Sequence, residues 1–95
     1  MTAEDRYCWT DTARVALIGE TGVILDVSQG KYYSLSPVAV QICRLLAEGR
    51  SVAEMTEELA GAFDMPKSTL AEDMRSFLAL LERAKLCRIA GEEAK

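Results

Sequence analysis

Residues 22–37, GVILDVSQGKYYSLSP, contain two runs of strand-forming residues followed by a helix start. Val23–Val27 and Lys31–Leu35 are rich in β-branched and aromatic residues, and Ser28-Gln29-Gly30 between them is typical of a turn. Ser36-Pro37 is typical of an N-cap with proline in the first helical position, where its missing N–H costs nothing. This stretch therefore predicts a hairpin whose second strand runs directly into a helix.

A further strand is predicted before this hairpin. Val15 and Leu17 alternate with Arg14 and Ala16, and this period of two is typical of a half-buried strand. We place the intervening turn at Glu20-Thr21-Gly22. Three strands joined by connections this short form an antiparallel meander, in which the first and third strands are the edges.

After the third strand, the apolar residues recur with the period of a helix. A first helix is predicted between Ser36 and Gly49, and a second begins with the capping box Ser51-Val52-Ala53-Glu54. Pro66 starts a third helix that runs to about Ala84. The helical residues expected to face the core are Val38, Ile42, Leu45, Leu46, Val52, Met55, Leu59, Phe63, Leu70, Met74, Phe77, Leu78 and Leu81. The predicted fold class is α+β, a three-stranded antiparallel meander followed by three helices.

A chain of 95 residues has room for one modest core, and we expect one domain over residues 13–90. Residues 1–12 have no clear period and are predicted to be a partly ordered N-terminal segment. The aromatic candidates for docking in this segment are Tyr7 and Trp9. Residues 86–89 are predicted to add a short extended segment, and the polar residues 91–95 are predicted to be a flexible tail.

The composition argues against catalysis by this chain. It contains no histidine, and its three cysteines, Cys8, Cys43 and Cys87, are far apart without a C-x-x-C spacing. This disfavours a zinc site and excludes a Cys–His or Ser–His pair within the chain. No glycine-rich phosphate-binding motif occurs, and the helical carboxylates fall on predicted polar faces. We therefore expect no enzyme activity, no metal, no cofactor and reduced thiols.

The charge and hydropathy patterns bear on partners and location. The formal net charge is −4, whereas proteins that neutralise nucleic-acid phosphates usually carry a basic surface. No apolar run approaches the roughly 20 residues of a membrane span. The first residues, MTAEDRYCW, are polar and acidic where a signal peptide is basic and then apolar. We expect a cytoplasmic protein that binds neither nucleic acid nor membrane.

The order of motifs resembles PqqD-like proteins, the recognition elements for precursor peptides that are made ribosomally and then modified. The motifs are G-x-Y-Y-x-L at Gly30–Leu35, E-G-x-S-V at Glu48–Val52 and D-x-x-x-F-L-x-x-L at Asp73–Leu81. The resemblance covers roughly residues 14–90. One departure is Lys85, which stands where the family often has glycine. A lysine in the left-handed conformation of such a helix end costs roughly 1 kcal/mol.

The resemblance implies a winged-helix-like domain that binds the leader segment of a precursor peptide without catalysis. The leader would add to the third strand as a further strand and lie in a groove beside the third helix. A free-standing chain of this size is most similar to the discrete leader-binding proteins of lasso-peptide pathways, which work with a leader peptidase and a cyclase. The peptide chaperone of pyrroloquinoline quinone biosynthesis is the alternative within the family.

The residues agree physically with this binding mode. The third strand is an edge, so an extended peptide can pair with its free backbone groups. The free energy gained from backbone hydrogen bonds is nearly cancelled by the entropic cost of ordering the peptide. Side-chain pockets must therefore add affinity. The predicted peptide-binding residues are Lys31, Tyr32, Tyr33, Ser34, Leu35, Thr69, Asp73, Ser76, Phe77, Leu80 and Arg83.

Individual roles within this set stay open. Tyr33 and Leu35 are expected to pack under the helices, which leaves Tyr32 free to cover the outer sheet face or to touch a partner enzyme. Leu80 either forms the floor of a groove or widens the core stripe. Asp73 either meets a cationic or hydroxyl group on the leader or is an isolated surface carboxylate.

Two other classes of function compete with peptide binding. A winged-helix nucleic-acid-binding protein would read a groove with its third helix, but here acidic and basic residues mix on that helix. An assembly subunit of a larger enzyme would differ only in what occupies the edge strand. We expect a monomer, with a possible dimer formed through the same edge.

Overall fold

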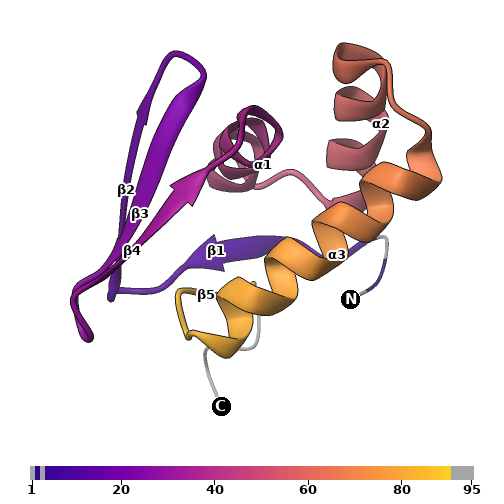
Figure 1. The fold of residues 1–95 in the computed structure, drawn as a ribbon. Helices are drawn as coiled ribbons and strands as arrows, with labels where there is room; N and C mark the ends of the chain where they lie inside the picture. Colours follow the sequence, from indigo (N-terminus) through magenta and orange to yellow (C-terminus); the bar gives the residue numbers. More distant parts are fainter. Residues whose placement is uncertain (1, 3, 91–95) are drawn as a thin grey trace.

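Two antiparallel sheets and three helices make up the computed structural model, which describes residues 2 and 4–90 (Figure 1). In chain order the elements are β1 (Tyr7–Trp9), β2 (Ala13–Ile18), β3 (Thr21–Asp26), β4 (Lys31–Leu35), α1 (Pro37–Ala47), α2 (Val52–Phe63), α3 (Lys67–Arg83) and β5 (Cys87–Ile89). The predicted α+β class, an antiparallel meander followed by three helices, is confirmed. The tail predicted at residues 91–95 lies outside the described residues.

The meander has the strand order β2-β3-β4, with β2 and β4 as its edges, as predicted. Its first turn lies slightly earlier than expected, because the two-residue loop is Gly19-Glu20, with a φ of +60° at Gly19. Gly22 lies within β3 instead of in the turn. A Cβ on Gly22 would come within 2.7 Å of the Leu17 side chain and 3.2 Å of the Leu35 side chain. Close packing across the sheet therefore favours glycine at position 22, because the two leucine side chains would have to shift to admit a Cβ.

The helices begin and end where the capping signals predicted. The hydroxyl of Ser36 accepts a hydrogen bond from the Ala39 N–H at 3.1 Å, and Ser51 and Glu54 form a complete capping box. Gly49 follows the end of α1 with a φ of +80°. None of the helices in the described part of the chain is long and apolar enough to cross a bilayer.

The core lies between the inner face of the meander and the three helices. Helix α1 contacts β3 and β4, α2 packs against both α1 and α3, and α3 contacts β5. The helical residues predicted to face the core are buried, except Val38, Phe63 and Phe77, which are half-buried at its margin. Figure 1 shows the helices on one side of the meander, so the described helices cover only one face of this sheet.

Strand β1 was not predicted. It pairs antiparallel with β5, with Tyr7 opposite Ile89 and Trp9 opposite Cys87. Tyr7 is 2% exposed and Trp9 packs against the core, so both aromatic candidates for docking do dock. The extended segment predicted at residues 86–89 is confirmed as β5. A three-residue strand carries too little period to be recognised without its partner from the other end of the chain.

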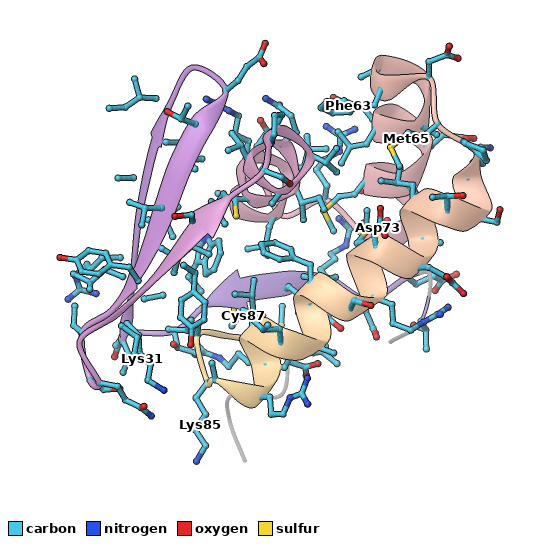
Figure 2. All side chains as sticks on the ribbon, viewed as in Figure 1. Lys31, Phe63, Met65, Asp73, Lys85 and Cys87 are labelled. Atoms are coloured by element: carbon cyan, nitrogen blue, oxygen red, sulfur yellow. The ribbon has the colours of Figure 1, made fainter. Side chains whose placement is uncertain are left out.

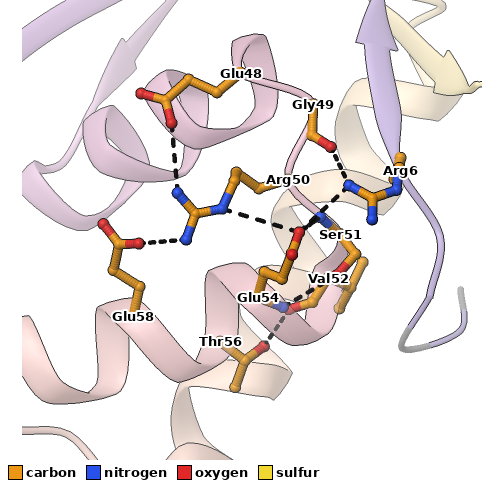
Figure 3. Close-up of polar contacts among 9 residues, drawn as sticks. All are labelled: Arg6, Glu48, Gly49, Arg50, Ser51, Val52, Glu54, Thr56 and Glu58. Carbon is orange, nitrogen blue, oxygen red and sulfur yellow. Dashed lines mark hydrogen bonds and ion pairs between the residues drawn. The ribbon is translucent and has the colours of Figure 1, made fainter.

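The N-terminal segment is also tied to the loop between α1 and α2 (Figure 3). The N–H of Val52 donates to the Asp5 carbonyl at 2.9 Å. The Arg6 guanidinium donates to the Gly49 carbonyl. Arg6 also pairs with the Glu54 carboxylate at 3.3 Å. The hydrogen bond from the Ser51 N–H and the charge of Arg6 lower the pKa of Glu54. These contacts hold the N-terminal segment beside the loop between α1 and α2.

Lys85 has the left-handed conformation that its place in the motif predicted, with a φ of +63°. The hydroxyls of Thr10 and Thr12 donate to its carbonyl at 2.6 and 3.1 Å, which holds this turn in place. Figure 2 shows its side chain pointing away from the fold. The hydrogen bonds that hold this turn are made by the Lys85 backbone, so they do not depend on the lysine side chain.

We expect Lys85→Gly to raise the free energy of unfolding by up to about 1 kcal/mol, because glycine has no Cβ penalty in this conformation. Urea denaturation followed by circular dichroism measures the change. As a control, Glu82→Gly, within α3, is expected to lower the free energy of unfolding by about 1 kcal/mol. A destabilised Lys85→Gly variant would contradict this interpretation.

Candidate functional site

The free edge of β4 is the starting point of the candidate site. In the described residues β4 pairs only with β3, in a register that sets Tyr33 opposite Ile24 and Lys31 opposite Asp26. Along the other side of the strand, alternate N–H and C=O groups point away from the sheet. An extended chain can therefore pair with residues Lys31–Leu35.

The turn before β4 is fixed by a buried aspartate. Asp26 is 1% exposed, and its Oδ1 accepts hydrogen bonds from the Ser28 hydroxyl at 2.7 Å, the Ser28 N–H at 3.0 Å and the Gln29 N–H at 3.3 Å. The Gly30 N–H donates to the Asp26 carbonyl at 2.7 Å. The hydrogen bond from the Ser28 hydroxyl lowers the pKa of Asp26 most, with help from the two backbone N–H groups and the charge of Lys31. This turn sets where β4 begins.

The side chains of β4 divide between its two faces. Tyr33 and Leu35 are half-buried and pack against the core, as expected from strand alternation. Tyr32 is 72% exposed and Ser34 is exposed on the outer face, while Lys31 is exposed at the start of the strand. A chain that paired with β4 would therefore meet backbone along its length, with the helices on its inner side.

A pocket of about 300 Å³ lies between the start of α1 and the middle of α3. Its α3 wall is made by Asp73, Ser76 and Phe77, three of the predicted site residues. The α1 wall consists of Ser36, Val38, Ala39 and Ile42. The pocket thus combines an apolar floor with hydroxyl and carboxylate groups, and it can accept an apolar side chain that ends in a donor.

Three predicted residues of α3, Thr69, Leu80 and Arg83, do not line the pocket. Together with Asp73 and Ser76 they are spaced by three and four residues, which places all five on one side of α3, and all five are exposed to solvent. This α3 flank consists of Thr69, Asp73, Ser76, Leu80 and Arg83. Leu80 is 42% exposed, so it is not part of the core stripe. Figure 2 places Lys31 on β4 and Asp73 on α3, the two elements that border the candidate site.

Sequence reasoning missed the contribution of α1 to the pocket. The sequence predicts Ser36 only as an N-cap, and Val38 and Ile42 only as core residues. The available signal was the absence of any loop between β4 and α1, since Leu35 is followed directly by Ser36 and Pro37. A helix that starts at the end of the edge strand must place its first turn beside whatever pairs with that strand.

A larger hollow of about 650 Å³ lies on the other side of α3, between α2 and α3. Ala71 and Arg75 line it, and at about 100° per residue they face away from Asp73. The ion pair between Lys67 and Glu57, at 2.6 Å, stands at its rim. Among the described residues, those that line this hollow belong to no strand, so they do not offer the free strand edge that distinguishes the β4 site.

The pKa values of the buried thiols and the mixed charges on α3 are compatible with a surface that binds a peptide. Burial raises the pKa of Cys43 and of Cys87 to about 12, so neither thiol is a ready nucleophile. On α3, the exposed residues include both acids and bases, a mixture that disfavours the close approach of phosphates. These residues are Glu72, Asp73, Arg75, Glu82 and Arg83.

Comparison with known proteins agrees with this geometry. The family model for coenzyme PQQ synthesis protein D (PqqD) matches residues 21–86. The solved structure of TbiB1 in complex with the TbiA(beta) leader peptide is 28% identical, with a TM-score of 0.75 over 87% of this chain and 94% of that chain. A lasso peptide synthetase B1 complexed with the leader peptide has the same fold, at 20% identity and a TM-score of 0.78, over 87% of this chain and 98% of that chain. No curated protein matches this chain.

We expect Asp26→Asn to lower the melting temperature at pH 7, because asparagine keeps an acceptor oxygen but removes the charge that strengthens these hydrogen bonds. A lowered pKa means that the carboxylate stabilises the folded state above the ordinary aspartate pKa of about 3.9. That stabilisation is lost as the pH falls through the lowered pKa, so the two proteins should then melt alike. Thermal melts across this pH range test the prediction. A difference in melting temperature that does not change with pH would instead indicate that the substitution distorts the turn.

Proposed function

The chain belongs to the PqqD family, and from this premise we propose that it binds the leader segment of a ribosomally made precursor peptide. The observation that carries the proposal is the free edge of β4 beside a pocket shared by α1 and α3. We propose that the leader adds to the meander as a fourth strand along Lys31–Leu35. Its side chains would then face the pocket and the α3 flank.

The energetics assign different roles to the strand and the helix. Each backbone hydrogen bond contributes about 0.5–1.5 kcal/mol net, and ordering each peptide residue costs about 1–2 kcal/mol. Pairing with β4 would therefore orient the leader without binding it tightly. A buried leucine or aromatic side chain adds roughly 1.5–3 kcal/mol. We propose that Phe77 and Leu80 supply this apolar contact. Asp73 would accept a hydrogen bond from a polar group of the leader, and Ser76 would accept or donate one.

We propose that the bound leader belongs to a lasso-peptide type of pathway. Support comes from the likeness to TbiB1, which was solved with a leader peptide and is similar over most of both chains. In this proposal the chain delivers the peptide to a separate leader peptidase and cyclase, which carry out the chemistry. The lack of histidine and the buried thiols of Cys43 and Cys87 support a partner that binds and does not catalyse.

A second candidate is the peptide of coenzyme PQQ synthesis, because the matching family model is named after that pathway. The same β4 edge and pocket would serve either leader. Side-by-side titration with the two leader peptides separates the candidates, since the cognate leader should bind at least about tenfold more tightly, a difference of about 1.4 kcal/mol.

Leu80→Asp is expected to weaken leader binding at least about tenfold, because a carboxylate would replace an apolar contact in the groove. The test titrates a synthetic N-terminal half of the precursor peptide encoded beside this gene into the isotope-labelled protein. We expect NMR shifts along Lys31–Leu35 and Asp73–Arg83, with a low-micromolar Kd, about −8 kcal/mol.

The matched control for this variant is Ala79→Asp, which introduces the same charge one residue earlier on α3. Ala79 is exposed and lies about 100° around the helix from Leu80, outside the α3 flank. Binding should stay within about twofold of the wild-type value, well under 1 kcal/mol. An equal loss of leader affinity in the two variants would show that Leu80 has no specific role in the site. If the peptide causes no NMR shifts in the wild-type protein, the leader-binding proposal is wrong for that peptide.

A further inference from the structure

The site between β4 and α3 has two ends, and the pocket lies at one of them. Ser36, from the start of α1, lines the pocket together with Asp73 and Phe77 from the middle of α3. Since Ser36 directly follows Leu35, the pocket lies beside the end of β4. The other end of the site lies at the start of the same strand, beside Lys31.

A series of contacts places the end of α3 next to the start of β4. The hydroxyl of Thr12 donates to the Lys85 carbonyl at 3.1 Å, and the Val27 N–H donates to the Thr12 carbonyl at 2.9 Å. Val27 follows β3, whose last residue, Asp26, pairs with Lys31. The turn after α3 therefore lies beside the turn before β4. Figure 2 shows Lys31 and Lys85 at the same corner of the molecule.

The length of the site corresponds to a short stretch of extended peptide. Lys31 and Leu35 are the two ends of β4, which puts them about 13 Å apart along the strand. On α3, the axial distance from Asp73 to Arg83 is about 15 Å. A peptide that fills the pocket with one side chain would therefore place a residue about four or five positions away beside Lys31 and Arg83.

Three cations lie at the end of the site that is remote from the pocket. This basic end, as we define it, consists of Lys31, Arg83 and Lys85, and all three are exposed. Strand alternation puts Lys31 on the same face as Tyr33, toward the helices, and Arg83 belongs to the α3 flank. In the part of the chain that the structure describes, none of the three forms an ion pair. Their charges are therefore available to a ligand.

The carboxylates of the neighbouring segments do not occupy these cations. Asp26 lies opposite Lys31, but its carboxylate is buried and accepts hydrogen bonds from the turn. Glu82 lies about 100° around α3 from Arg83, on the side away from the α3 flank. Asp11, between β1 and β2, is exposed and forms no ion pair with the described residues. A carboxylate on a bound peptide would therefore find unpaired cations at the basic end.

We propose that the basic end selects leaders that carry an acidic residue about four or five positions from the side chain in the pocket. This inference rests on the proposed function, because it assigns a feature of the leader to the same site. Arg83 would bind the carboxylate through paired N–H donors, and Lys31 and Lys85 would add positive charge.

Such a contact would fix the register of the leader. A free strand edge pairs with many extended peptides, and a shift by one residue turns every side chain to the other face. The pocket holds the leader at one end of β4 only. A second, charged contact at Lys31 and Arg83 would leave one register in which both ends are satisfied.

The experiment measures the affinity of the full-length chain for the synthetic leader by titration calorimetry, at ionic strengths of about 0.01 M and about 1 M. Arg83→Glu reverses a charge of the basic end, and Arg83→Gln only removes it. The matched control is Arg75→Glu, because Arg75 is also an exposed cation of α3 but lines the hollow on the other side of the helix. Thermal melts establish that each variant is folded. In the leader, each acidic residue is changed in turn to its amide.

At low ionic strength we expect Arg83→Glu to bind the leader at least about fivefold more weakly, with a smaller loss for Arg83→Gln and a change within about twofold for Arg75→Glu. At about 1 M the variants should bind alike, because the screening length falls from about 30 Å to about 3 Å. One acidic residue of the leader should account for the effect. Its amide should weaken binding to the wild-type chain, and its replacement by lysine should restore binding to Arg83→Glu.

Two results would overturn the inference and leave leader binding intact. The first is an equal affinity of Arg83→Glu and Arg75→Glu for the leader at low ionic strength. The second is a leader in which no single amide substitution weakens binding to the wild-type chain. A wild-type chain that binds no leader at either ionic strength would instead overturn the proposed function, and the inference with it.

Discussion

The absence of a loop between β4 and α1 is the constraint on which the rest of this structure depends. Ser36 is at once the first residue after the strand and the N-cap of the helix, with its hydroxyl bonded to the Ala39 N–H. Helix α1 must therefore start at the end of the edge strand and cross the inner face of the sheet. This placement buries Ile24, leaves the side of β4 free and puts the first turn of α1 into the pocket wall.

Because of the same constraint, backbone groups and side chains can contribute to recognition in different ways. A free strand edge can pair with almost any extended peptide, so it provides orientation and little selectivity. In the proposed function, selectivity would come from the pocket lined by Ser36, Phe77 and their neighbours and from the α3 flank. In the proposed function, a small domain can supply both, because it has only to hold a peptide in one direction and one register.

The turn at Asp26 and the junction at Ser36 fix the two ends of β4. The buried carboxylate of Asp26 accepts three hydrogen bonds, and these hydrogen bonds lower its pKa. A strand that is held at both ends can stay extended and unpaired on one side. Its free edge is then available to pair with an extended peptide.

The sequence by itself determined the meander, the order of the helices and their capping, because periodicity and capping depend on residues that are close along the chain. It also placed Lys31–Leu35 on an edge and grouped the α3 flank by helical spacing. Only the tertiary structure decided the pairing of β1 with β5, the entry of α1 into the pocket and the packing role of Gly22. Each of these features joins residues distant in sequence, and their contact depends on how the elements pack, which no local pattern encodes.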